Sequence, residues 1–164
     1  MADIDVKTFW QTLGQRPIGA TIVTVQGETG PAGFLGLSAS HVSADPPLML
    51  VSIGKKTSAL KDIRASRHFA VNFLAAGAEA LLDSFGGRTD DKGASRFDPD
   101  KWTILETGAP VYRDAQGAMD CRLEDTIERG DVVIAIGRVV AVSAGGEGEP
   151  LVLFRGKPRR LSPA

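Results

Sequence analysis

The chain has 164 residues, of which 43% are hydrophobic and 24% are charged, and its formal net charge is −1. This composition is typical of a soluble globular protein, and the length suits a single domain over residues 1–164. The small net charge gives no electrostatic reason to expect nucleic acid or membrane binding, and no apolar run approaches the roughly 20 residues of a membrane span. One cysteine excludes an intramolecular disulfide, and the N-terminus lacks a signal-peptide pattern, so we expect a cytoplasmic protein.

The first third of the chain predicts a short helix followed by a β-hairpin. Apolar residues recur at helical spacing across residues 6–13, and Gly14 is placed to end this helix. A β-branched run at 20–25 leads through a Gly-Glu-Thr-Gly turn at 27–30 into a return strand at 32–35. The chain therefore enters an antiparallel sheet after its first helix.

The most informative stretch runs from residue 33 to residue 63. Its first strand gives way to a loop of small residues at 36–43, whose backbone N–H groups and hydroxyls carry little side-chain bulk. Such a surface suits a flat polar ligand. After Pro46-Pro47, the nearly all-apolar run 48–53 predicts a strand covered on both faces.

A candidate anion site follows this strand. Residues Gly54-Lys55-Lys56-Thr57-Ser58 open a predicted helix that ends near Ser66, and the start of a helix gathers unpaired N–H groups and the positive end of the dipole. A small-residue bed beside an anion site would fit flavin mononucleotide (FMN). The alternative is that the serines form ordinary turns, that Thr57 or Ser58 only caps the helix, and that the lysines are solvated.

The middle of the chain predicts a strand, a helix and a polar surface segment. Residues 69–74 form the strand, and residues 77–85 place their apolar side chains on one helical face. Leu81 and Leu82 of that face are expected in the core. Segment 88–100 is polar and contains glycine, so we expect a surface loop of the kind that often covers a site.

The second half predicts a β-meander. Two long strands at 118–128 and 132–142 flank a tight turn, and Gly137 is placed to form a bulge. Two short strands at 151–154 and 158–161 follow. Short strands with turn signals at near-regular intervals favour an antiparallel barrel that carries a few helices.

Metal chemistry and nucleophilic catalysis find no support in the sequence. His41, His68 and Cys121 have no metal-ligand spacing, and Cys121 is expected to be a buried strand residue. No Gly-x-Ser-x-Gly motif is present, and Ser38 has no recognisable partner. We therefore predict no metal site and no catalytic side chain, which suits a bound flavin because the cofactor itself carries the redox chemistry.

Short motifs occur in a specific order along nearly the whole chain. They are Arg16-Pro17-Ile18-Gly19, residues 33–43 leading to Asp45-Pro46-Pro47-Leu48, Lys56-Thr57-Ser58, residues 69–74, Ser84-Phe85, Arg96-Phe97, Gly108-Ala109-Pro110, Ala118-Met119-Asp120-Cys121, Gly130-Asp131, Gly137-Arg138-Val139, and Pro150-Leu151 to Phe154-Arg155-Gly156. In this order they resemble the flavin reductase-like, FMN-binding split-barrel family, the small reductase components of two-component monooxygenases. The resemblance implies a mainly β protein with an antiparallel split β-barrel, a homodimer, and an NAD(P)H-dependent flavin reductase that reduces FMN or FAD and supplies a partner monooxygenase.

Fourteen residues are the predicted flavin-binding set. They are Leu35, Gly36, Leu37, Ser38, Ala39 and Ser40 against the ring, Ser52, Ile53 and Gly54 flanking it, Lys56, Thr57, Ser58 and Arg88 at the phosphate, and Phe85 at the helix end that approaches the flavin in the resembled family. Arg88 has a second interpretation, as a solvated loop charge.

Three positions depart from the family pattern. Val132 follows Gly130-Asp131 where many reductases carry a histidine near the nicotinamide, no tyrosine follows Gly156, and Leu35 replaces a threonine. Two other functions therefore stay open: a flavoprotein that keeps FMN as a prosthetic group, and a non-catalytic binding module. The reductant is NADH or NADPH, and a 2′-phosphate of NADPH could meet a basic C-terminal set. These residues are Arg155, Lys157, Arg159 and Arg160.

Overall fold

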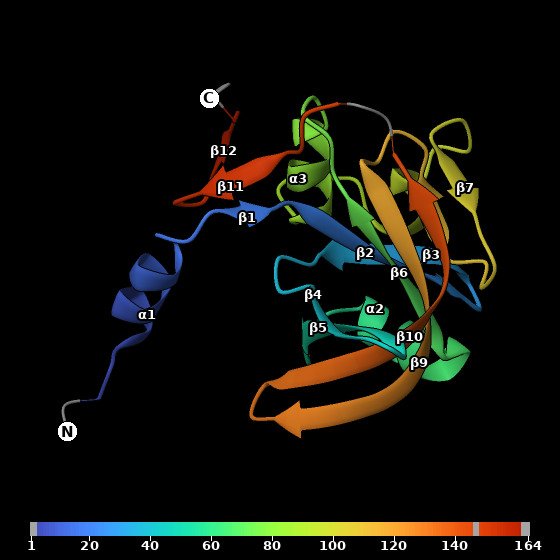
Figure 1. The fold of residues 1–164 in the computed structure, drawn as a ribbon, viewed down its shortest axis with the longest axis horizontal. Helices are drawn as coiled ribbons and strands as arrows, with labels where there is room; N and C mark the ends of the chain where they lie inside the picture. The colour runs from blue at the N-terminus through green and yellow to red at the C-terminus, as the bar shows by residue number, and fades with distance from the viewer. Residues whose placement is uncertain (1–2, 146–147, 162–164) are drawn as a thin grey trace.

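The computed structural model describes residues 3–145 and 148–161 (Figure 1). Its helices are α1 (Val6–Leu13), α2 (Ala59–Ser66), α3 (Glu79–Phe85) and the 3-10 helix η1 (Gly93–Arg96). Its strands are β1 (Ile18–Gly19), β2 (Thr21–Gly27), β3 (Gly30–Leu35), β4 (Ser40–Ala44), β5 (Pro47–Gly54), β6 (His68–Phe73), β7 (Trp102–Ile104), β8 (Pro110–Tyr112), β9 (Gly117–Arg129), β10 (Val132–Ala144), β11 (Val152–Phe154) and β12 (Lys157–Arg159).

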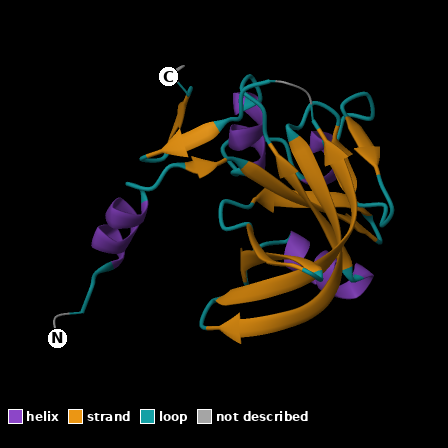
Figure 2. Cartoon of the chain, in the orientation of Figure 1, coloured by secondary structure: helices purple, strands orange, loops and turns teal. Residues whose placement is uncertain are grey.

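A curved antiparallel sheet forms the body of the molecule (Figure 2). Its seven strands lie in the order β3-β2-β6-β9-β10-β5-β4. A small sheet of β1, β11 and β12 stands on the side that faces α1, and β7 pairs with β8 elsewhere (Figure 1). The prediction of a mainly β fold with antiparallel strands and a few helices is confirmed.

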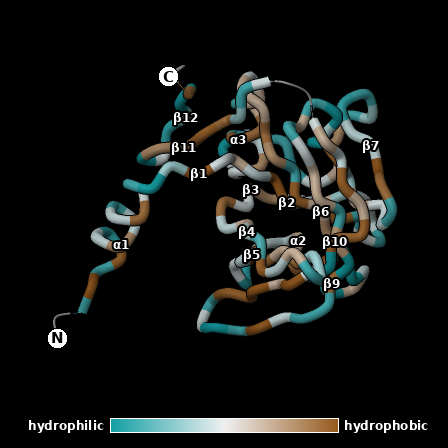
Figure 3. Tube along the Cα trace, in the orientation of Figure 1, coloured by the Kyte–Doolittle hydropathy of each residue, from teal (hydrophilic) through white to brown (hydrophobic). Residues whose placement is uncertain are grey.

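The inner face of the sheet holds the main core, against which α2 packs. Val23, Val51, Phe69 and Val133 come from four different strands and are fully buried, as is Ile63 of α2. In β5 and the first half of β10 the buried positions recur at every second residue, whereas β2 and β6 are buried along most of their length. Apolar and polar segments alternate along the trace (Figure 3). The predicted strands at 69–74, 118–128 and 132–142 are confirmed as β6, β9 and β10.

Strand β5 differs from its prediction. Met49, Val51 and Ile53 are buried, whereas Leu48 and Leu50 on the other face are only partly buried. The expectation of a strand covered on both faces is therefore wrong for the single chain, because no layer of this chain covers the outer face of β5 along its length.

Gly137 forms the predicted bulge between β9 and β10. The register shifts between Ile136 and Gly137. A Cβ atom at this position would lie 2.7 Å from Cε1 of Phe69 and 2.9 Å from Cβ of Cys121. The glycine therefore lets the Phe69 ring pack against the bulge.

A buried polar side chain joins the small β7–β8 sheet to the barrel. The Nδ2 amide of Asn72 donates to the carbonyl of Ile22 at 3.2 Å, to Oγ1 of Thr24 at 3.3 Å and to the carbonyl of Pro110 at 3.4 Å. Its Oδ1 accepts the N–H of Tyr112 at 2.8 Å. Every polar atom of this buried side chain is thus paired.

Candidate functional site

A cleft of about 1050 Å³ lies between the barrel and the N-terminal helix. Its floor includes Ser52, Gly54 and Val132, from β5 and the start of β10. One wall includes Leu35 and Leu37, from the end of β3 and the loop that follows it. The opposite wall comes from α1 and from the β11–β12 hairpin. This volume is at the upper end of the ~300–1,000 Å³ typical of small-molecule sites.

Six of the fourteen predicted flavin contacts line this cleft. They are Leu35, Leu37, Ser38, Ser52, Gly54 and Thr57. The sequence prediction therefore found the floor and one wall of the cleft.

Four neighbours of these residues do not line the cleft. Ile53 is fully buried in the main core because side chains alternate along β5. Gly36 faces Val23 of β2, Ala39 packs against the core, and Ser40 lies exposed on the edge strand β4. These four residues do not line the cleft, and their predicted places, against the ring for Gly36, Ala39 and Ser40 and beside it for Ile53, stay predictions.

The hydroxyl of Ser38 fastens the small-residue loop to β5. It accepts the N–H of Ser52 at 2.9 Å and donates to the carbonyl of Ser52 at 3.1 Å. In contrast, the backbone N–H groups of Leu37 and Ser38 donate to no acceptor within the described part of the chain. The loop therefore offers two backbone donors to a ligand, while its serine hydroxyl serves the fold.

A second, basic cavity of about 700 Å³ lies at the start of α2. Thr57 lines both this cavity and the cleft. The remaining lining residues are Lys55, Lys56, Ser58, Leu60, Lys61, Arg64 and Ala65. The two hollows thus meet at Thr57, and the predicted phosphate residues Lys56 and Ser58 belong to the basic one.

Free backbone donors gather at this cavity. Within residues 3–145 and 148–161, the N–H groups of Lys56, Ser58 and Ala59 find no backbone or side-chain acceptor. Ser58 occupies the N-cap position but makes no side-chain capping bond. The alternative of Ser58 as a simple helix cap lacks the hydrogen bond that it requires, and the donor set fits an anion such as a phosphate.

Two of the surrounding cations share one carboxylate. Lys55 Nζ lies 2.8 Å from Oε2 of Glu128, and Nη2 of Arg64 lies 2.6 Å from its Oε1. The hydrogen bonds from Lys55 and Arg64 hold the pKa of the Glu128 carboxyl below its ordinary value. Lys56 and Lys61 form no ion pair among the described residues, so they are the cations open to a bound anion.

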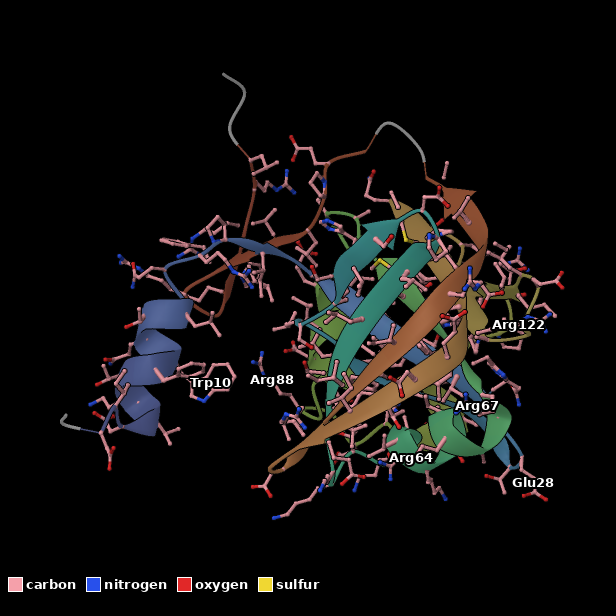
Figure 4. All side chains as sticks on the ribbon, turned by 60° about the horizontal axis from the view of Figure 1, so that its bottom comes forward. Trp10, Glu28, Arg64, Arg67, Arg88 and Arg122 are labelled. Atoms are coloured by element: carbon pink, nitrogen blue, oxygen red, sulfur yellow. The ribbon has the colours of Figure 1, made fainter. Side chains whose placement is uncertain are left out.

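Phe85 and Arg88 are placed away from both hollows. Phe85 is 4% exposed and packs against Trp102, and the guanidinium of Arg96 lies 4.5 Å from its ring centroid. Arg88 pairs with Asp83 at 3.1 Å on the surface (Figure 4). α3 turns its apolar face into a second core, whose members include Ile22, Leu74, Leu82, Phe85 and Trp102, and the loop after α3 lies outside it. Neither Phe85 nor Arg88 lines a hollow of the single chain, and their role as flavin contacts stays a prediction.

The polar segment 88–100 is a surface loop but not a lid over the cleft. None of its residues lines either hollow. Arg96 instead donates from Nη2 to the carbonyl of Gly33 at 3.1 Å, and Phe97 packs beside Trp102. This segment is attached to β3 and the second core.

The sequence prediction missed the wall that faces the barrel. Trp10 and Leu13 of α1 line the cleft together with Leu153 and Arg155 of the C-terminal hairpin. Trp10 lies on the side of α1 that faces the barrel (Figure 4). Periodicity had indicated an apolar face on this helix, but no local signal reports that residues about 140 positions apart meet.

The register of the C-terminal hairpin places the predicted basic set relative to the cleft. Lys157 pairs with Phe154 and Arg159 pairs with Val152, so these four side chains share one face. Leu153 lines the cleft from the other face. Lys157 and Arg159 therefore point away from the cleft, and only Arg155 of the predicted basic set lines it.

The described residues contain neither a candidate metal site nor a helix that could span a membrane. No group of three or more potential metal ligands occurs among the described residues. Across the same residues, every helix is too short or too polar to pass through a bilayer.

Comparison with known proteins decides the family. Residues 13–162 match the family model described as the flavin reductase like domain. This chain belongs to that family. A relative from Ancylobacter novellus, an FMN reductase (NADH) RutF, is 40% identical over 151 residues, which cover 92% of this chain and 82% of the relative.

Two further flavin reductase relatives extend the comparison. The reductase subunit HsaB of a flavin-dependent monooxygenase from Rhodococcus jostii is 34% identical, over 98% of this chain and 80% of that protein. The solved structure of the NADH:FAD oxidoreductase SgcE6 from Streptomyces globisporus C-1027 matches with a TM-score of 0.88 and 30% identity, over 99% of each chain. The predicted family and its split-barrel fold are confirmed.

Proposed function

We propose that this chain is an NAD(P)H:flavin oxidoreductase that reduces FMN, with FAD as an alternative substrate, and that it passes reduced flavin to a partner monooxygenase. One observation carries the proposal: a cleft with apolar walls and free backbone donors meets a basic, donor-rich cavity at Thr57. A flavin nucleotide also has two parts, a flat ring that suits the apolar cleft and a phosphate that suits the basic cavity. Two relatives of this chain are an FMN reductase and the reductase subunit of a flavin-dependent monooxygenase.

The described residues fit a flavin in two parts. Leu35 and Leu37 offer apolar surface for the ring, and the unpaired N–H groups of Leu37 and Ser38 would stabilise negative charge on its carbonyl edge. Lys56, Thr57 and Ser58 would hold the phosphate. When bound, the flavin accepts a hydride from the nicotinamide.

The cleft itself supplies orientation rather than acid–base chemistry. No histidine, cysteine, aspartate or glutamate occurs among its described lining residues. Val132, where many family members carry a histidine, contributes only an apolar surface. Direct hydride passage between two stacked rings needs no proton carrier, so the chain's task is to align the rings and exclude water.

The same proposal includes a single domain, a homodimer and a cytoplasmic location. Leu50, Ile134 and Ile136, on the outer face of the sheet, are only partly buried, which favours cover by a second copy. Cys121 is buried and unpaired, which suits a reducing compartment.

The test of this function is a reductase assay on the purified protein. We expect oxidation of NADH or NADPH that depends on added FMN or FAD, and the absorbance of the reduced nicotinamide reports its rate. Comparing the rates of the four combinations ranks the two nicotinamides and the two flavins. Flavin that stays bound without turnover would favour the prosthetic-group alternative. A colourless protein that neither binds flavin nor oxidises the nicotinamides would favour the binding module and refute the proposal.

The phosphate site has its own test. We expect the double substitution Thr57→Ala and Ser58→Ala to weaken FMN binding by about 1–3 kcal/mol, the scale of hydrogen bonds to a charged group. Riboflavin, which lacks the phosphate, is expected to bind the wild type and the double variant with equal affinity. Binding is measured by quenching of flavin fluorescence, and exposed Thr89→Ala is the matched control. Unchanged FMN affinity in the double variant would place the phosphate elsewhere.

A further inference from the structure

The β11–β12 hairpin turns at a residue whose backbone conformation is unfavourable. Phe154 pairs with Lys157, so Arg155 and Gly156 form a two-residue loop. Their φ angles are 52° and 72°, and a type I′ turn requires a positive φ at both loop positions. Such turns prefer Asn-Gly, because asparagine tolerates the left-handed region better than most residues that have a Cβ atom. An arginine at the first loop position is therefore an exception to the turn's own preference.

Attachment of the hairpin to the segment after α1 does not explain this arginine. The N–H of Arg155 donates to the carbonyl of Gly14 at 3.0 Å, and an asparagine would supply the same backbone donor. The Arg155 side chain is exposed, so it fills no core position. A residue that is held in an unfavourable backbone region without a packing reason indicates a functional role.

Two neighbours fix the position of the Arg155 guanidinium. Its Nε and Nη2 donate to Oε1 of Gln15 at 3.1 and 2.8 Å, and its Cζ lies 5.0 Å from the ring centroid of Phe154. Gln15 is neutral, and Arg155 forms no ion pair within the described part of the chain. Nη1 donates to no acceptor there. The guanidinium thus keeps an uncompensated charge and spare donors in a defined place.

The charged residues of the cleft are both arginines. Arg155 and Arg16 line it, and its described lining contains no lysine, aspartate or glutamate. Like Arg155, Arg16 forms no ion pair with any residue that the structure describes. A cleft whose charges all have one sign attracts a ligand of the opposite sign, so this end of the cleft favours an anion.

We propose that Arg155 determines the binding of the nicotinamide substrate by holding the pyrophosphate of its dinucleotide, with Arg16 as the second cation. The inference rests on the proposed reductase function. In that function the flavin lies on the barrel side, with its ring at Leu35 and Leu37 and its phosphate near Thr57. The nicotinamide stacks on the free face of the ring, toward the wall that carries Arg155. The pyrophosphate has two negative charges, and the planar guanidinium matches phosphate oxygens with paired N–H donors.

The pyrophosphate fits this wall better than the 2′-phosphate of NADPH does. Lys157 and Arg159 point away from the cleft, so the C-terminal basic set does not gather around one extra phosphate there. The pyrophosphate is common to NADH and NADPH, and recognition of it would serve both reductants. FAD also carries a pyrophosphate, and the experiment below separates these sources.

The substitution Arg155→Asn tests the inference, because it removes the cation and supplies the residue that the turn prefers. With saturating FMN, we expect the KM for NADH and for NADPH to rise roughly ten- to a hundredfold, the factor that corresponds to hydrogen bonds with a charged group. We expect kcat to change little, and Tm to stay the same or to rise by up to about 4 °C. Arg159→Asn, the same change on the face turned away from the cleft, should leave both KM values unchanged.

Calorimetric titration with NAD⁺ in the presence of FMN gives the dissociation constant without turnover. We expect Arg155→Asn to weaken NAD⁺ binding at least roughly tenfold and to leave FMN binding unchanged. Unchanged NAD⁺ affinity, or a wild type that binds no NAD⁺, would overturn the inference. A KM change for NADPH alone would assign Arg155 to the 2′-phosphate, and weaker FAD binding alone would assign it to the flavin. A large fall in Tm would assign it to the fold, and each of these results also overturns the inference.

Gln15 is a positioning residue in this scheme, and Gln15→Glu tests that role. The carboxylate keeps an acceptor for Nε and Nη2 of Arg155 but compensates its charge. We expect the KM for both nicotinamides to rise while Tm is retained. The KM of the wild type should rise with added salt, and that of Gln15→Glu should rise less. Equal KM values and equal salt dependence would show that the charge of Arg155 is not used. A wild type that binds NAD⁺ but reduces no flavin refutes the proposed function alone, since the titration still decides the role of Arg155.

Discussion

Replacing Asn72 by leucine is expected to lower the free energy of unfolding by about 3 kcal/mol. Leucine has a similar size, so the effect comes from polarity rather than from a cavity. The substitution leaves the N–H of Tyr112 without its acceptor and deprives the carbonyls of Ile22 and Pro110 of one donor, although Pro110 keeps the hydroxyl of Thr24 at 2.5 Å. Buried groups that lose their partners retain the full cost of desolvation. Urea denaturation monitored by circular dichroism gives the change.

The matched control for Asn72 is Thr126→Val. Thr126 is partly buried on β9, and its hydroxyl makes no hydrogen bond to the described residues. We expect a change within about 0.5 kcal/mol for this variant. A loss below about 1 kcal/mol for Asn72→Leu would show that water or a shifted backbone satisfies the freed groups, and the network would then matter little to stability.

The thiol of Cys121 is expected to be inert in the folded protein. Burial, and secondarily the neighbouring Asp120, raise the pKa of this thiol to about 12. Only the thiolate is nucleophilic, and near pH 8 its fraction is then lower than that of a free cysteine by roughly three orders of magnitude. We expect iodoacetamide to modify the native protein at least that much more slowly than the urea-unfolded protein. Comparable rates would mean that β9 opens frequently.

The same pKa shift predicts a loss of stability in alkali. Below the unfolded pKa of about 9, the thiol is protonated in both states. Above it the unfolded chain loses this proton while the folded chain keeps it, so stability falls by about 1.4 kcal/mol per pH unit until the folded pKa is reached. Between about pH 8 and about pH 10, wild type should therefore lose roughly 1.4 kcal/mol relative to Cys121→Ala. The free energies of unfolding of both proteins are measured by urea denaturation at each pH. An equal change in wild type and Cys121→Ala would contradict this expectation.

Local patterns were sufficient where a segment's own residues decide its structure. Helix α1 begins and ends where apolar spacing and Gly14 predicted, and the β2–β3 hairpin turns at the predicted Gly-Glu-Thr-Gly segment. The bulge at Gly137 was also predicted from the sequence, by a single glycine within a β-branched strand. Each of these depends on backbone preferences within a few residues.

The residues predicted to contact the flavin line the cleft only in part. Leu35, Leu37 and Ser38 line the cleft, but Phe85 is buried in the second core and Arg88 pairs with Asp83 at the surface. The apolar face of α3 was visible in its spacing. The direction from which other elements pack against that face was not, because it depends on distant strands.

The sequence by itself determined most of the elements, their antiparallel character, and the succession of a small-residue loop, an apolar strand and a Lys-Thr-Ser helix start. It missed strand β4 (Ser40–Ala44), which begins within the loop predicted at 36–43. Only the tertiary structure decided that Thr57 joins a cleft to a basic cavity, and that α1 and Arg155 form the far wall. The physical reason is that secondary structure follows from local backbone and side-chain preferences, whereas a cavity is the space between elements whose separation in the chain carries no local signal.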